Sequence, residues 1–205
     1  MKTKLGIYGG TFAPVHNGHI NAALEFKRQF KLDRLLIIPT YIPPHKALPL
    51  GDSPKDRLNM LHLAFDDETY RKLGIEISDY ELNKGGKSYT VDTLKHFDSE
   101  TADLYMLCGT DMLLTIDSWK DPISIAQLAT LVFVRREQPD SSINKKIEDK
   151  IEYLKTAMNF RIQELVMSPI EISSSYIRAN ITSDLTGLIP EKVEQYIKTH
   201  NLYRE

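Results

Sequence analysis

One stretch near the start of the chain constrains the fold more than any other feature. It reads GGTFAPVHNGH over residues 9–19, follows an apolar run at 5–8 and precedes a helical pattern predicted over about 17–30. Strand, glycine loop and helix in this order predict the opening of an α/β fold in which an anion lies against the first turn of the helix.

The residues of this stretch favour phosphate as the anion. Gly9 and Gly10 let backbone N–H groups approach closely, and the first turn of a helix has unsatisfied N–H donors. His16 and His19, three residues apart, project to the same side and can both donate to phosphate oxygens. A glycine turn and a histidine cap are the alternatives. The spacing matches neither the dinucleotide fingerprint nor the P-loop.

Composition limits the class of protein. The chain has 205 residues, of which 41% are hydrophobic and 26% are charged, so we expect one domain over 1–205. A formal charge of -2 gives no attraction to nucleic acid, which favours a small-molecule partner. The single cysteine, Cys108, excludes an internal disulfide and lies in an apolar run where we expect a buried thiol. With no membrane span or leader pattern evident, we expect a cytoplasmic protein.

Alternating strand and helix patterns continue along the chain. Together they predict a Rossmann-like, doubly wound and mostly parallel α/β sheet with helices on both faces. Further strands are predicted at 34–38, 103–108, 131–134 and 161–167, and an extended segment is predicted at 75–82. Helices are predicted at 56–65, 142–158, 173–181 and 190–200. Another helix is expected to begin within 88–93, and helical pieces are expected over 112–129. In the helix at 56–65, Leu58, Leu61 and Ala64 or Phe65 are expected on one face, and the serine and threonines of 88–93 are expected to cap their helix.

A second polar cluster, ISSSYIR at residues 172–178, is suited to a polyphosphate. Ser174 and Ser175 can bond phosphate oxygens through hydroxyl and backbone, and Arg178 adds a planar charge one turn later. A serine-rich helix cap with a surface arginine is the alternative. His45 and Lys46 follow the strand at 34–38, at the edge where open α/β sheets bind ligands.

Taken together, these strings resemble a known family. GTFxPxHxGH and ISSSxIR resemble the nucleotidyltransferase superfamily with the HxGH signature. The strings IPPHK (42–46), SYT (88–90), CGTD (108–111), Trp119 and LIP (188–190) to Leu202-Tyr203 are similar, in order and over essentially the whole chain, to the bacterial nicotinate-nucleotide adenylyltransferase family.

The resemblance implies transfer of AMP from ATP, a substrate, to the 5′-phosphate of nicotinic acid mononucleotide, with Mg²⁺ assisting. On the nucleotide side, the backbone of Gly9, Gly10, Thr11 and Phe12 would form a cradle, and His16 and His19 would donate to the triphosphate. Gly109 and Asp111 would contact the ribose. Ser174, Ser175 and Arg178 would hold the leaving phosphates. His16, His19, Lys46 and Arg178 would carry catalysis. A capping role is the alternative for Asp111.

The acceptor side follows from the same resemblance. Trp119 would stack on the nicotinate ring, and the backbone of Thr90 and Lys120 would contact its carboxylate. Lys46 with His45 would meet the mononucleotide phosphate, and Arg136 would add positive potential. Taken alone, a single tryptophan such as Trp119 is more often a core residue. An exposed strand end explains Arg136 equally well.

Three alternatives accompany this interpretation. A zinc site at His16 and His19 lacks a third soft ligand nearby, so no protein-held metal is expected. Ala13 stands where the family usually has an acidic or polar residue, which puts metal placement in doubt. One rival function is a sister adenylyltransferase acting on nicotinamide mononucleotide or on phosphopantetheine; SYT and Trp119 argue against phosphopantetheine but do not separate the acid from the amide. The other rival is a non-catalytic nucleotide-binding module. A homo-oligomer stays open.

Overall fold

The fold is built on one sheet of six parallel strands. The computed structural model describes residues 2–44, 48, 51–65, 68–99, 101–135, 141–167 and 172–204. The strands are β1 (Thr3–Gly10), β2 (Arg34–Pro39), β3 (Ile75–Ile77), β4 (Ala102–Gly109), β5 (Ala129–Val134) and β6 (Ile162–Leu165). Their spatial order is β3-β2-β1-β4-β5-β6, and each neighbouring pair is parallel. The predicted doubly wound sheet is confirmed, and its order reverses direction between β1 and β4.

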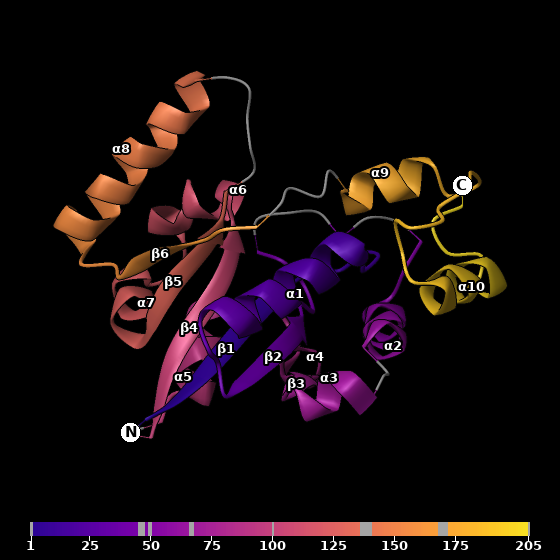
Figure 1. Cartoon of the computed structure of the whole chain (residues 1–205), viewed down its shortest axis with the longest axis horizontal. Coiled ribbons are helices and arrows are strands. Elements are labelled where there is room, and N and C mark those ends of the chain that lie inside the picture. Colours follow the sequence, from indigo (N-terminus) through magenta and orange to yellow (C-terminus); the bar gives the residue numbers. More distant parts are fainter. Residues whose placement is uncertain are drawn as a thin grey trace.

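Helices cover both faces because the strands are apolar on both sides. Along β2, Leu35 and Ile37 belong to one buried cluster, while Leu36 and Ile38 belong to the other. The first cluster packs against α1 (Asn17–Gln29), α2 (Pro54–Ala64), α9 (Ser174–Ala179) and α10 (Glu191–Thr199); the second packs against α5 (Thr90–Phe97), α6 (Thr110–Leu113), α7 (Pro122–Leu128) and α8 (Ser141–Met158). Figure 1 shows α10 beside α2 and α9 above them, at the opposite end of the molecule from α8.

The prediction of an extended segment over 75–82 is wrong in its second half. β3 ends at Ile77, and α4 occupies Tyr80–Lys84. The Tyr80 ring stacks on His96 with centroids 3.8 Å apart, and Glu81 is buried. These contacts with α5 favour a helical turn over the period-two pattern, so tertiary packing overrides the local signal.

The prediction of side-chain caps for the helix that begins within 88–93 is also wrong. Tyr89 occupies the N-cap position of α5 and no side chain caps it, because the Ser88 hydroxyl instead accepts a hydrogen bond from the Tyr41 N–H at 3.0 Å. In α2, Leu61 and Ala64 are buried, as is Phe65 at its end, and Leu58 is half-buried; Arg57 and Met60 are also buried.

The C-terminal segment returns to the start of α2. Leu202 and Tyr203 are buried in the first cluster, and the Tyr203 N–H approaches the Gly51 carbonyl at 3.4 Å. Gly51 has φ +94°, and a Cβ there would lie 2.8 Å from the Tyr203 nitrogen. Only glycine suits this position, for both backbone and steric reasons. No helix within the described ranges has the length and apolar character to cross a bilayer.

We predict that Gly51→Ala destabilises the fold by about 2 kcal/mol or more, because it adds steric overlap to backbone strain. Gly187→Ala is the matched control, since Gly187 has φ +78° with open space around its Cβ position. Urea unfolding of both variants measures the difference. Equal losses in the two variants would show that the Tyr203 contact contributes nothing.

Candidate functional site

A cavity of about 750 Å³ lies at the carboxyl ends of β1 and β4, where the strand order reverses. Open α/β sheets bind ligands at this place. The cavity wall contains every predicted site residue that falls within the described ranges: Gly9, Gly10, Thr11, Phe12, His16, His19, Thr90, Gly109, Asp111, Trp119, Lys120, Ser174, Ser175 and Arg178. Residues from five separate segments of the sequence therefore share one cavity, although their roles there stay predictions.

The two histidines stack at the entry to α1. Their ring centroids are 3.6 Å apart with an interplanar angle of 25°. The backbone N–H of His16 donates to the ring nitrogen Nδ1 of His19 at 3.3 Å. Because Nδ1 of His19 acts as an acceptor, a neutral ring carries its proton on Nε2. His19 can thus present an N–H donor. Its ring also packs edge-on against the Phe12 ring, with the two ring centroids 5.0 Å apart.

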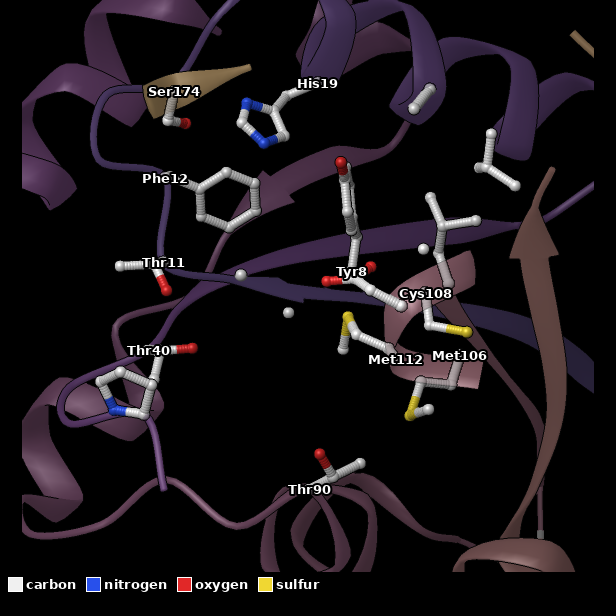
Figure 2. Close-up of a pocket in the computed structure, with 18 of the residues that line it drawn as sticks. Tyr8, Thr11, Phe12, His19, Thr40, Thr90, Met106, Cys108, Met112 and Ser174 are labelled. Carbon is white, nitrogen blue, oxygen red and sulfur yellow. The ribbon is translucent and has the colours of Figure 1, made fainter. Parts of the chain in front are cut away.

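In the glycine loop, Phe12 both lines the cavity and packs in the first buried cluster. Phe12 adopts φ +51°, and its side chain is buried among core residues. Gly10 permits this arrangement, since a Cβ there would lie 2.9 Å from the Phe12 ring. Figure 2 shows Phe12 and His19 on one side of the cavity and Thr90 across the open space from them.

Side chains of α9 bind the same loop. The Ser174 hydroxyl donates to the Pro14 carbonyl at 2.9 Å, and Arg178 donates to the Ala13 carbonyl at 2.6 Å and to Ser175 Oγ at 3.2 Å. These bonds join the two polar motifs, about 160 residues apart in the chain. Ser173, not Ser174, caps the helix by accepting from the Tyr176 N–H. The Ser174 hydroxyl is engaged as a donor, so a ligand there would meet its backbone N–H.

The opposite wall is formed by α5 and the segment around Trp119. Trp119 is half-buried and packs against the second apolar cluster while also lining the cavity, so the core and ligand-facing interpretations both hold in part. Lys120 Nζ pairs with Asp92 at 3.0 Å and lies 4.5 Å from the centroid of the Tyr89 ring. The Lys120 ammonium is therefore engaged with Asp92, while the residue lines the cavity.

Three predicted site residues, His45, Lys46 and Arg136, lie outside the described residues, and their roles stay predictions. The neighbouring Arg135 lines the cavity. Its guanidinium pairs with Glu148 at 2.6 Å and with Glu164 at 2.9 Å, which raises its pKa. The charge of Arg135 is therefore largely neutralised within the protein.

Glu81 is a cavity residue that the motif analysis missed. It is 6% exposed, and Oε1 accepts a hydrogen bond from the Thr93 hydroxyl at 2.6 Å. Burial raises the pKa of this carboxyl, against the smaller opposing effects of Thr93 and Ser88. The available signal was an acidic residue followed twelve positions later by a threonine on a predicted helix, which points to no known motif.

The described ranges contain no group of three or more His, Cys, Asp and Glu side chains that could hold a metal ion. Within the cavity wall the carboxyl groups come from Glu81 and Asp111. Cys108 also lines the cavity; it is buried as predicted, and burial raises its pKa. A metal in this cavity would therefore depend on oxygen ligands that the substrate brings.

Comparison with known proteins agrees with the geometry. The family model described as "Cytidylyltransferase-like" matches residues 7–180. A protein of Clostridium tetani named "Probable nicotinate-nucleotide adenylyltransferase" is 37% identical over 100% of both chains, and one of the same name from Desulfatibacillum aliphaticivorans is 34% identical over 98% of this chain and 99% of the relative. The chain belongs to the nicotinate-nucleotide adenylyltransferase family.

A solved structure supports the fold of this family. The nicotinic acid mononucleotide adenylyltransferase of Plasmodium falciparum, complexed with NaAD, superposes with a TM-score of 0.77 at 21% identity, covering 98% of this chain and 97% of the other. At that identity the likeness concerns the fold, and it extends over the whole doubly wound sheet.

We predict a pH-dependent effect of Glu81→Gln on stability. A carboxyl whose pKa is raised by folding stabilises the native state most below its unfolded pKa, and that contribution is lost as pH rises through the folded value. The amide keeps the Thr93 hydrogen bond without ionising, so the melting temperature of the variant should rise relative to the parent between about pH 5 and about pH 8.

Glu152→Gln serves as the control, because Glu152 is exposed on α8. Its melting temperature should keep a constant offset from the parent over the same pH range. A constant offset for Glu81→Gln as well would contradict the raised pKa of Glu81.

Proposed function

We propose that this chain transfers the adenylyl group of ATP to the 5′-phosphate of nicotinic acid mononucleotide, forming the deamido dinucleotide and pyrophosphate. The observation that carries the proposal is the junction of the two polar motifs. Arg178 and Ser174 bind the carbonyls of Ala13 and Pro14, so the histidine loop and the serine-rich helix meet at one cavity. The names of the full-length relatives supply the substrate.

The reaction needs no protein nucleophile. A phosphate oxygen of the mononucleotide attacks the α-phosphorus of ATP, the new P–O bond forms, and the bond to the β-phosphate oxygen breaks with its electron pair leaving on pyrophosphate. Because the attacking group is already an anion, catalysis depends on alignment of the two substrates and on neutralisation of charge. This fits a cavity where the cysteine is buried and its pKa is raised.

On the nucleotide side, donors would surround the triphosphate. His19 Nε2 and His16 would donate to the phosphate oxygens, and the backbone of residues 9–12 would lie along them. Arg178 uses two of its N–H groups within the protein, which leaves further donors of its guanidinium for the leaving phosphates. Asp111, exposed after β4 beside Gly109, would accept from the ribose hydroxyls.

On the acceptor side, the proposal uses Trp119 as the surface on which the nicotinate ring stacks. The backbone of Thr90 and Lys120 would contact the ring carboxylate, and Lys46 with His45 would bind the phosphate of the mononucleotide. Arg136 would add positive charge near the phosphates. The engagement of the Lys120 ammonium with Asp92 supports a backbone contact at that residue.

Magnesium fits this cavity as an ion carried by the nucleotide. Mg²⁺ commonly binds through one or two carboxylates together with substrate phosphates, and Asp111 is the exposed carboxylate of the wall. When bound, the ion would neutralise charge on the triphosphate. Ala13 brings no oxygen ligand of its own side chain to the loop.

We predict that His19→Ala lowers kcat for dinucleotide formation by about 10²-fold or more, while the affinity for ATP changes much less. The reason is that a donor to the transition state is removed from a phosphate cradle that otherwise persists. Formation of the deamido dinucleotide from ATP and nicotinic acid mononucleotide, followed by chromatography, measures the effect.

His62→Ala is the matched control, since His62 is exposed on α2 and does not line the cavity. It should retain the parent's kcat. If the parent forms no dinucleotide, the proposed function fails; if the parent and His19→Ala are equally fast, only the role of His19 fails.

A further inference from the structure

Arg57 lies behind the cavity and connects two of the loops that form its wall. Its side chain is 0% exposed. Nη1 donates to the carbonyls of Thr11, at 3.1 Å, and of Thr40, and Nη2 donates to the carbonyl of Tyr41 at 3.1 Å. Thr11 follows β1 and Thr40 follows β2, so one guanidinium joins the loops after two neighbouring strands; Figure 2 shows both threonines on the same side of the cavity.

A buried acid fixes the direction of this guanidinium. Asp52, whose side chain is 1% exposed, lies 3.6 Å from Arg57 Nε and accepts a hydrogen bond from the Tyr203 hydroxyl at 2.7 Å. A planar guanidinium with an acid on one edge presents its remaining donors in one fixed plane. The C-terminal segment thus takes part in orienting Arg57. Neither Arg57 nor Asp52 lines the cavity.

The connection continues to the acceptor wall. The Tyr41 N–H donates to Ser88 Oγ at 3.0 Å, and the Ser88 N–H donates to the Ile42 carbonyl at 2.9 Å. Ser88 directly precedes the Tyr89 and Thr90 pair at the start of α5. A continuous set of hydrogen bonds therefore runs from the glycine loop, through Arg57 and Tyr41, to the segment opposite the histidines.

We propose that Arg57 is a positioning residue that fixes the alignment of the nucleotide half of the cavity against the acceptor half. This inference rests on the proposed function, because alignment matters most when two bound substrates must react in line. Without Arg57 each half keeps its own contacts, and the Thr40 N–H still donates to the Gly10 carbonyl at 2.9 Å, but the carbonyls of Thr11, Thr40 and Tyr41 lose their shared donor. The expected consequence is a loss in kcat rather than in the binding of either substrate.

The test is Arg57→Lys, which keeps a positive charge beside Asp52 but cannot donate to three carbonyls from a planar fork. We expect kcat to fall by about 30-fold or more, while the KM values for ATP and for nicotinic acid mononucleotide each change by less than about threefold. Assays run well below the melting temperature of every variant. Binding of ATP alone, measured by calorimetry, should match the parent.

Tyr196→Phe is the matched structural control. The Tyr196 hydroxyl joins α10 to α2 by donating to Asp56 at 2.9 Å and accepting from Asn59 at 2.9 Å, and none of these residues lines the cavity. It removes a tie between the C-terminal region and α2 without touching the Arg57 set. We expect a lower melting temperature with kcat unchanged.

Asp52→Asn covers the outcome in which Arg57→Lys fails to fold. The amide still accepts from Tyr203 but no longer attracts the guanidinium, so kcat should fall by about five- to tenfold with KM values close to the parent's. The role of Arg57 is overturned if Arg57→Lys, or Asp52→Asn where Arg57→Lys does not fold, keeps the parent's kcat. It is also overturned if the loss of kcat/KM lies wholly in KM. A parent enzyme without turnover overturns the proposed function instead, so the two failures are separable.

Discussion

Three backbone carbonyls of one loop, at Thr11, Ala13 and Pro14, are held by side chains from distant helices. Arg57 of α2 binds the first, and Arg178 and Ser174 of α9 bind the other two. A loop that turns outward from a sheet cannot pair its own carbonyls in the ladder, so they need donors from elsewhere. Here those donors also fix where His16 and His19 stand, because both histidines follow the loop directly.

The electrostatics of the cavity suit a substrate rich in negative charge. Burial raises the pKa of the Glu81 carboxyl and of the Cys108 thiol, which favours the uncharged form of both groups. Arg178 meets carbonyl and hydroxyl oxygens rather than a carboxylate, so its positive charge is not cancelled by those contacts. A protein with a formal charge of -2 thereby offers a locally favourable site for phosphates.

The sequence was most informative where local pattern and tertiary role coincide. Glycines followed by a histidine pair at helical spacing predicted β1, its loop and α1, and the alternation of strand and helix patterns along the chain predicted a sheet covered on both faces. The pattern failed at Tyr80–Lys84, where stacking on His96 and burial of Glu81 decide the conformation. Arg57 was not predicted as a site residue, because its hydrogen bonds go to backbone carbonyls of the loops after β1 and β2. Its helical spacing with Met60, Leu61 and Ala64 does place it on the buried face of α2. Every residue has a backbone carbonyl, so a side-chain motif cannot show which carbonyls accept such hydrogen bonds.

Under the proposed function, the choice between acid and amide at the pyridine ring would depend on backbone donors, because the two substituents are nearly isosteric. The most direct measurement of the central claim is therefore pyrophosphate release with ATP and Mg²⁺, run side by side with nicotinic acid mononucleotide and nicotinamide mononucleotide. The account predicts release with the acid and a much larger kcat/KM for it than for the amide. Release with neither acceptor, or a preference for the amide, would contradict it.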